Sequence, residues 1–297
     1  MPGFFVVRNN ILDKNYLLSL ILYLFKGEIM AKNITLITGA TGGLGGAFAR
    51  ECALRGDNLF LTGTKKDRLE AITAEIKSSF PNIEVQSALC DLSDENQRKE
   101  LTIHIKELGY NVNYLINNAG LITEGETLLE DDEKIIKSIR VNCEGTIDMT
   151  QKILKMRDKN EPLTILTVSS LAYAYPMPYM NIYSATKRML VTFMTALAQE
   201  LKGTNVVISV VCPSGIYTTK EMREAIASQG LAGKLSSHEP EYIVKFALKK
   251  ASKKKLITIP GVFNRFLKTV SSPFSEKFLA KVVGNRWKKS QKKRNMK

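Results

Sequence analysis

Apolar residues in the middle of the chain alternate between two spacings. Short apolar runs, rich in β-branched residues, are separated by longer segments in which apolar residues repeat at the helical period. The runs predict strands over 33–38, 58–62, 83–89, 114–117, 163–169, 206–211 and 256–259. The longer segments predict helices that include 66–79, 93–109, 131–157 and 182–202.

This alternation predicts the fold class. Apolar strands that alternate with helices indicate a parallel sheet whose two faces are both covered. Because crossovers between parallel strands are right-handed, we expect an α/β fold with a doubly wound, Rossmann-like sheet. We expect one such domain over 31–260, an apolar appendage over 1–30 and a basic helical tail over 261–297.

The N-terminal appendage contains an apolar stretch at 16–25. Ten helical residues rise about 15 Å, half of the roughly 30 Å hydrocarbon core of a bilayer. We therefore do not expect a full transmembrane helix. Because Met30 resembles an ordinary protein start, we interpret 1–29 as an appendage or an upstream translation start, with a monotopic membrane anchor as the alternative.

The formal charge of +14 is concentrated at the C-terminal end. Residues 245–297 contain 17 of the 43 lysines and arginines and one acidic residue, Glu276, which leaves 26 basic and 28 acidic residues before them. Such a tail binds polyanions or anionic membrane surfaces, or only aids solubility. It contains no recognised motif for reading nucleic acid, so we expect no specific nucleic-acid partner.

The tail also has a helical spacing of apolar residues. Two sets would each share a helix face: Phe263, Phe266, Leu267 and Val270, and then Phe274, Phe278, Val282 and Trp287. Such basic amphipathic helices lie at membrane interfaces, although the same faces also suit packing on the domain or on a second subunit. We favour packing for 262–270 and peripheral membrane contact for 274–289, in an otherwise cytoplasmic protein.

The four cysteines are scattered, and the chain has two histidines. Isolated cysteines inside apolar stretches suggest buried thiols in a reducing compartment rather than a disulfide framework. No cluster has the spacing of zinc ligands, so we expect no metal site.

A glycine-rich turn, TGATGGLG at 38–45, follows the first predicted strand and precedes a helix. Glycines there let the backbone approach a pyrophosphate, and the helix offers free N–H groups and the positive end of its dipole. The spacing fits two patterns, because Gly39 and Gly45 combine equally well with Gly43 or with Gly42.

A tyrosine and a lysine stand four residues apart in the predicted helix 182–202. Tyr183 and Lys187 therefore share one helix face. A free tyrosine has a pKa of about 10, too high for proton exchange at neutral pH, and a nearby ammonium group lowers that pKa. The spacing predicts a phenol that gives a proton to a carbonyl oxygen or takes one from a hydroxyl.

Seven motifs in order resemble those of the short-chain dehydrogenase/reductase family. They cover about residues 33–220: TGATGGLG, CDL (90–92), NNAG (117–120), VN (141–142), VSS (168–170), YSATK (183–187) and PSGIYT (213–218). NNAG and the thirteen-residue separation of Ser170 and Tyr183 resemble the compact single-domain branch. A branch with an added sugar-nucleotide domain is the alternative.

The resemblance implies a catalytic set: Asn142, Ser170, Tyr183 and Lys187. Ser170 would bind the reacting oxygen, Lys187 would also hold the nicotinamide ribose, and Asn142 would support a water path to the lysine. The implied cofactor contacts are Gly39, Thr41, Gly43, Leu44, Gly45, Thr64, Lys65, Asp91, Leu92, Asn118, Ala119, Gly120, Tyr183, Lys187, Pro213, Ile216 and Thr218.

Some of these contacts have assigned partners on the cofactor. The resemblance places Asp91 at the adenine, residues 118–120 beside the adenine ribose and Thr218 near the nicotinamide amide. Asp91 also fits an N-cap of the next helix, since DLSD is a typical helix start. Ser214 departs from the family pattern, which usually has glycine there.

The end of the second strand bears on the choice of cofactor. An acid there would bind the ribose 2′-hydroxyl, and none lies at 62–66. Lys65 or Lys66 would meet a 2′-phosphate, so we expect NADP(H) to be preferred over NAD(H), although Thr64 stands where the family often has arginine. The alternative for both lysines is a solvated helix start, where cations are poorly placed.

Two segments indicate an apolar substrate. The segment LAYAYPMPYM (171–180) is uncharged and rich in aromatic residues and methionine, and 219–238 predicts a helical flap with Met222 and Leu231. Such walls suit a small apolar ketone or alcohol, of fatty-acyl or steroid type, unless they pack against another subunit. The resemblance implies a homodimer or homotetramer through 131–157 and 182–202. A non-catalytic nucleotide- or membrane-binding protein is the alternative function.

Overall fold

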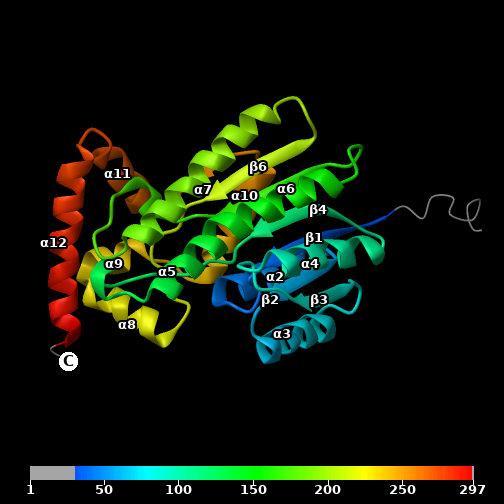
Figure 1. Ribbon diagram of the computed structural model, residues 1–297, viewed down its shortest axis with the longest axis horizontal. Coiled ribbons are helices and arrows are strands. Elements are labelled where there is room, and N and C mark those ends of the chain that lie inside the picture. Colours follow the sequence, from blue (N-terminus) through cyan, green and yellow to red (C-terminus); the bar gives the residue numbers. More distant parts are fainter. Residues whose placement is uncertain (1–30, 296–297) are drawn as a thin grey trace, which may run out of the picture. The chain divides into compact units, whose positions relative to one another are not determined.

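The computed structural model describes residues 31–295, with side chains up to Lys289. The expectations for 1–29 lie outside the described residues. Residues 33–297 form one compact unit, built on a seven-stranded parallel sheet of order β3-β2-β1-β4-β5-β6-β7 (Figure 1). The strands are β1 Lys32–Thr38, β2 Leu59–Gly63, β3 Val85–Leu89, β4 Tyr110–Asn117, β5 Leu163–Val168, β6 Val206–Val211 and β7 Ile257–Thr258.

Helices connect the strands and continue beyond the sheet. The α-helices are α2 Gly43–Leu54, α3 Lys66–Ser79, α4 Glu95–Glu107, α5 Asp132–Ile139, α6 Thr146–Met156, α7 Asn181–Glu200, α8 Lys220–Ser228, α9 Gly230–Ser236, α10 Pro240–Ser252, α11 Val262–Ser271 and α12 Glu276–Asn295. Two short 3-10 helices, η1 Thr127–Leu129 and η3 Leu171–Ala174, and one π-helical segment, η2 Arg140–Gly145, complete the described elements. The expected doubly wound fold and the predicted strands and helices are confirmed.

Two hydrophobic cores lie on opposite faces of the sheet. Neighbouring residues of one strand point to opposite faces, so Ile37 packs with α2, α3 and α10, whereas Leu36 packs with α4, α6 and α7. Both faces of the sheet are therefore covered by helices, as the apolar strands require. This arrangement leaves the carboxyl ends of β1, β4 and β5 side by side at one edge, where the predicted motifs follow them.

The helix expected over 131–157 contains a local change of winding. α5 passes into the π-helical segment η2 before α6 begins. The segment surrounds Asn142, which is fully buried and binds backbone outside its own helix. The flap expected at 219–238 is two helices, α8 and α9, and the tail forms α11 and α12. Of the described helices, none is long and apolar enough to cross a membrane.

Candidate active site

The glycine-rich turn after β1 needs glycine at two positions. Gly39 has a φ of +66°, and a Cβ atom on it would lie 2.8 Å from the Cα of Ala119. A Cβ on Gly45 would lie 2.1 Å from the carbonyl oxygen of Gly39. A Cβ on Gly43 would lie 3.0 Å from the Thr218 side chain, whereas Gly42 has no neighbour nearer than 3.5 Å. The packing therefore favours the pattern that combines Gly39, Gly43 and Gly45.

The N-terminal end of α2 is open toward this turn. Its N-cap residue, Gly42, provides no side-chain cap, and the first helical turn contains no acidic residue. The backbone N–H groups at the first helical positions, Gly43, Leu44 and Gly45, have no partner within the helix. Together with the positive end of the helix dipole they form a site suited to an anion, so the turn fits the pyrophosphate of a dinucleotide.

The NNAG segment after β4 is tied to the glycine turn. The Asn118 side-chain amide donates hydrogen bonds to the carbonyl oxygens of Thr38 and Gly39, each at 3.0 Å. In return, the Thr38 hydroxyl accepts the backbone N–H of Asn118 at 3.0 Å and that of Ala119 at 3.2 Å. These bonds hold the two predicted cofactor segments in one arrangement.

Gly120 brings this segment to the predicted catalytic residues. A Cβ on Gly120 would lie 3.2 Å from the Lys187 amine nitrogen and 3.3 Å from the Asn142 side-chain oxygen. Asn142 accepts the N–H of Leu121 at 2.7 Å and donates to the Leu121 carbonyl at 2.9 Å and to the Thr186 hydroxyl at 3.1 Å. The π-helical winding around Asn142 is a feature that is frequent at functional sites.

Ser170, Tyr183 and Lys187 come together from β5 and α7. The Ser170 hydroxyl accepts the backbone N–H of Ala172 at 3.1 Å at the start of η3. The amine of Lys187 donates to the carbonyl oxygen of Val168 at 3.0 Å and lies 5.8 Å from the centre of the Tyr183 ring. The structure thus brings all four predicted catalytic residues together.

The protonation of this set is governed by burial. Burial raises the pKa of the Tyr183 phenol, and hydrogen bonding with Ser170 only partly offsets the rise. Burial also lowers the pKa of Lys187 from 10.5 to about 8. The expected lowering of the phenol pKa by the lysine is therefore wrong for the protein alone, because both charged forms lose water. At neutral pH the phenol carries its proton and can donate it.

Replacing Lys187 with methionine should stabilise the cofactor-free protein at pH 7. The pKa of Lys187 is about 8 in the folded protein and 10.5 in the unfolded chain, so between these pH values the unfolded chain binds more protons. Burial of the lysine therefore lowers the free energy of unfolding by its full amount below pH 8, and by less as the pH rises toward 10.5. We expect a gain of about 2–3 kcal/mol at pH 7 that shrinks toward pH 10. Urea unfolding at both pH values measures it. A gain that is equal at both values, or equal to that of the exposed control Lys202→Met, would contradict the assignment.

The residues predicted for the adenine end lie near the ends of β2 and β3. A Cβ on Gly63 would lie 2.8 Å from the Thr41 side chain, so the glycine turn lies against the end of β2. Thr64 and Lys65 follow directly and are exposed. Within the described part of the chain Lys65 has no ion-pair partner, whereas Lys66 lies 3.9 Å from Glu70.

Asp91 and Leu92 follow β3. The Asp91 carboxylate lies 2.8 Å from the Lys137 amine and accepts the Ser93 hydroxyl at 2.6 Å. Burial alone would raise the pKa of Asp91, but these bonds outweigh burial and lower it. The alternative of Asp91 as N-cap of the next helix is wrong, because Asp94 caps α4 through the N–H groups at 96 and 97. Leu92 is buried.

The PSGIYT segment lies beside the glycine turn. Thr218 packs against Gly43, and the buried Pro213 accepts the N–H of Leu171 at 2.7 Å through its carbonyl oxygen. Ile216 forms a backbone bridge with His238. Ser214 is not among the described non-glycine residues with positive φ. The departure from the family's glycine therefore carries no backbone strain.

Two contacts at the site were missed from the sequence. The Ser169 hydroxyl donates to the carbonyl oxygen of Lys187 at 2.8 Å, which fixes the backbone of the lysine. Lys137 neutralises Asp91 from α5. The VSS motif carried a signal for Ser169, but nothing local marks Lys137, which lies 46 positions from its partner.

Among the described residues no group of acidic, histidine or cysteine side chains is placed to hold a metal, and all four cysteines are buried and unpaired.

Comparisons with known proteins support the family resemblance and the fold. The model of the short chain dehydrogenase family matches residues 33–229. A very-long-chain 3-oxoacyl-CoA reductase from Bos taurus is 30% identical over 62% of this chain and 59% of its own length, and human 17-beta-hydroxysteroid dehydrogenase type 3 is 32% identical over the same shares. A short-chain dehydrogenase from Sphingobium yanoikuyae, solved in complex with NADPH, superimposes with a TM-score of 0.68 at 24% identity, covering 82% of this chain and 97% of its own.

The chain belongs to the short-chain dehydrogenase family, a class of NAD(P)-binding oxidoreductases, as its motifs predict. It spans about three fifths of the length of the curated relatives named above.

Proposed function

We propose that the protein is an NADP(H)-dependent reductase of an apolar carbonyl compound, with Tyr183 as the proton donor. The observation that carries the proposal is the meeting of Lys187 and Asn142 at Gly120, beside Tyr183 and next to the glycine turn. A pyrophosphate at the turn and a nicotinamide ribose at Lys187 are compatible with one bound dinucleotide.

The proposed chemistry assigns one task to each residue. The cofactor, when bound, supplies the hydride. Ser170 orients the carbonyl oxygen by a hydrogen bond, and Tyr183 gives its proton to that oxygen as negative charge develops on it. The raised pKa of the buried phenol keeps the proton in place at neutral pH. Burial lowers the pKa of Lys187 to about 8, so its amine is largely protonated at pH 7. The ammonium group then stabilises the phenolate that remains after Tyr183 has given up its proton.

NADP(H) is the proposed cofactor. Thr64 and Lys65 follow the end of β2 and are exposed, and no acidic residue stands at 62–66 to repel a 2′-phosphate. The absence of an ion-pair partner for Lys65 among the described residues leaves its charge available for the phosphate, while Lys66 already faces Glu70.

The substrate is proposed to be apolar, of fatty-acyl or steroid type. Residues 173–180, which follow Ser170 after two buried residues, are half-buried and uncharged. Leu231 and Leu235 of the flap are 73% and 50% exposed, which leaves apolar surface for a substrate to cover. The relatives named for 3-oxoacyl-CoA and 17-beta-hydroxysteroid chemistry support the same class.

A homodimer or homotetramer through α5 and α7 is also proposed. Ile136 and Ile139 of α5 and Met189 of α7 are 49%, 38% and 47% exposed. Large apolar side chains exposed on two neighbouring helices are typical of a subunit interface.

A cofactor and substrate panel tests the proposal. NADPH consumption should be fastest with long-chain acyl or steroid ketones and slow with small polar ketones, and the KM for NADPH should lie below that for NADH. Higher activity with polar ketones would contradict the substrate class, and equal KM values would contradict the cofactor preference. Cofactor binding without turnover of any carbonyl would favour a non-catalytic nucleotide-binding protein instead.

A further inference from the structure

The two C-terminal helices and the turn between them expose large apolar side chains, which we name the tail surface: Val262, Phe266, Val270, Phe274, Phe278 and Val282. Their exposed fractions range from 48% to 74%. Residues four positions apart lie on one side of a helix, so the three residues of α11 share one side of it, and Phe278 and Val282 share one side of α12. The rings of Phe274 and Phe278 stack with their centres 5.0 Å apart. A row of this kind marks an interaction site.

The other side of α12 already packs on the domain. Gly284 is buried, and a Cβ on it would lie 3.1 Å from the Pro178 side chain. Trp287 is partly buried and lies nine positions from Phe278, on the opposite side of the helix. The expectation that Trp287 shares a helix face with Phe278 is therefore wrong. One side of α12 therefore faces the domain, and the side that carries Phe278 and Val282 is left exposed.

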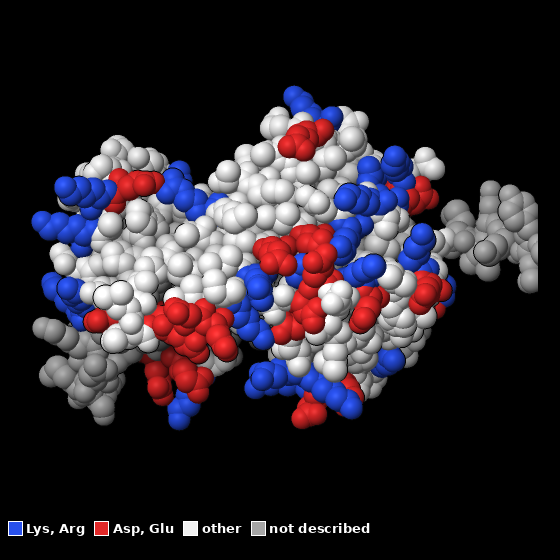
Figure 2. All heavy atoms as spheres, viewed as in Figure 1, with Lys and Arg blue, Asp and Glu red and all other residues white. Residues whose placement is uncertain are grey.

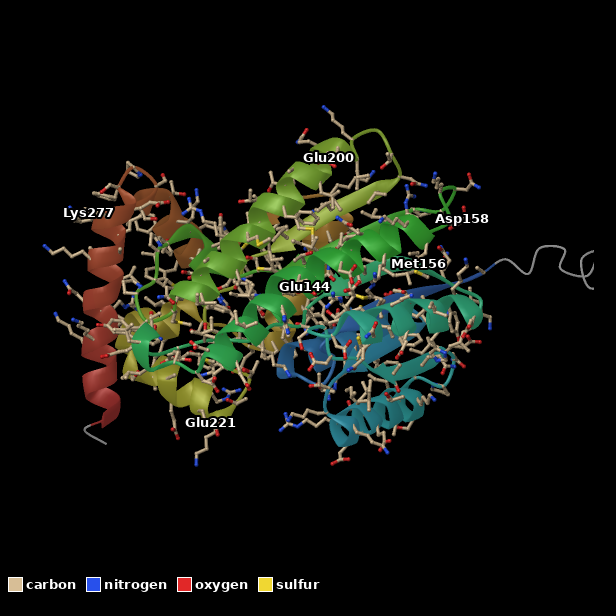
Figure 3. The ribbon with its side chains drawn as sticks, in the orientation of Figure 1. Glu144, Met156, Asp158, Glu200, Glu221 and Lys277 are labelled. Atoms are coloured by element: carbon tan, nitrogen blue, oxygen red, sulfur yellow. The ribbon has the colours of Figure 1, made fainter. Side chains whose placement is uncertain are left out.

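The charges carried by α11 and α12 themselves are almost all positive. Lys281 lies about 60° around the helix from Phe278, and Lys288 and Arg286 lie about 80° away on either side. All three are exposed, and Lys and Arg side chains gather along the margin of the domain formed by α12 (Figure 2). Lys277 lies at the start of the same helix (Figure 3). The one acidic residue of the tail, Glu276, is bound at 2.5 Å by Arg188 of α7.

We propose that the tail surface docks on an anionic phospholipid bilayer, with its apolar row in the interface and its basic residues among the headgroups. An apolar stripe flanked by lysine and arginine is the pattern of a helix that lies in the membrane plane. Each basic residue near such a surface adds attraction to anionic lipids. A second copy of the chain is a poorer partner, because pairing two tail surfaces would bring their basic margins together.

Docking would place the bilayer beside the proposed substrate segment. The Tyr175 hydroxyl lies 3.3 Å from the Ser271 hydroxyl of α11, and Pro178 packs on α12. The helix α8 of the flap also contacts α12 (Figure 1). One consequence, which rests on the proposed function, is that an apolar carbonyl compound would reach the active site from the lipid phase.

Vesicle sedimentation with the full chain tests the docking. The protein should bind vesicles that contain phosphatidylserine more tightly than vesicles of phosphatidylcholine alone, and added salt should weaken the binding. Changing Phe274, Phe278 and Val282 together to serine should reduce binding at least about tenfold. The matched control, Leu54→Ser with Ile103→Ser, removes exposed apolar residues outside the tail and should leave binding unchanged.

A charge variant separates the electrostatic contribution. Lys281→Glu with Lys288→Glu should remove most of the preference for phosphatidylserine, whereas Lys99→Glu with Lys106→Glu, on the exposed side of α4, should retain it. Unchanged vesicle binding by the serine variant would overturn the proposal. Loss of vesicle binding on Ile21→Asp alone would also overturn it, because the anchor would then be the N-terminal segment. A change from dimer to monomer in the serine variant, without loss of vesicle binding, would overturn it as well.

The substrate consequence has its own measurement. The serine variant should consume NADPH normally with a water-soluble ketone and several-fold more slowly with a ketone dissolved in vesicles. Equal rates with both would contradict entry from the lipid phase. No turnover of any carbonyl by the unaltered protein would contradict the proposed function and leave the vesicle-binding result intact.

Discussion

Tyr183→Phe should lower kcat/KM for carbonyl reduction by about a hundred- to ten-thousand-fold, the usual contribution of a positioned proton donor. The substitution removes the hydroxyl and keeps the ring that lies 5.8 Å from the amine of Lys187. Packing around the ring should therefore change little, and the KM for NADPH should stay within a few-fold of that of the unaltered protein. Steady-state NADPH consumption and a separate cofactor titration measure the two effects.

The matched control is Tyr242→Phe, on α10. Tyr242 stacks on His238 with ring centres 4.7 Å apart, a contact that phenylalanine also makes, so activity should be unchanged. Retention of near-normal activity by the Tyr183 variant would refute the proton-donor role. Loss of cofactor binding in that variant would show instead that the phenol holds the dinucleotide rather than the substrate.

The elements of the fold could be predicted because their signals are local. The residues of α3 repeat at the helical period between two turn segments, and the predicted range 66–79 equals the observed helix. The π-helical segment around Asn142 has no such signal. It depends on hydrogen bonds from Asn142 to Leu121 and Thr186, which lie 21 and 44 positions away.

The proximity of the candidate catalytic residues was predictable from the sequence, but their energetics were less so. The spacing of Tyr183 and Lys187 predicts that they are neighbours, and they are. It does not show how much water the fold removes from them, and burial reverses the expected shift of the phenol pKa. Likewise, the apolar spacing of α12 predicts an amphipathic helix, but the packing of Gly284 on Pro178 decides which side faces outward.

In the glycine turn, too, the sequence predicts which residues are involved, but only the packing shows which of them cannot be replaced. From the sequence, Gly42 and Gly43 fit equally well between Gly39 and Gly45. In the structure a Cβ on Gly45 would meet a carbonyl oxygen at 2.1 Å and the Cα of Ala40 at 2.8 Å, both parts of the backbone that cannot turn aside. A Cβ on Gly42 would meet that same carbonyl oxygen at 3.5 Å, an ordinary contact, and the φ of Gly42 is −86°.

Gly45→Ala should therefore reduce the free energy of unfolding by about 2–4 kcal/mol, because the turn and the start of α2 must move apart. The same movement displaces the N–H groups that face the proposed pyrophosphate, so NADPH affinity should fall together with stability. Gly42→Ala should change the free energy of unfolding by less than about 1 kcal/mol. Urea unfolding of both variants, with and without NADPH, measures the difference.

If the two alanine variants were equally stable, the close approach of α2 to the turn would not exist in solution. If Gly45→Ala were unstable yet bound NADPH normally once folded, the pyrophosphate would have to lie elsewhere, since the anion site and the tight turn are made of the same backbone.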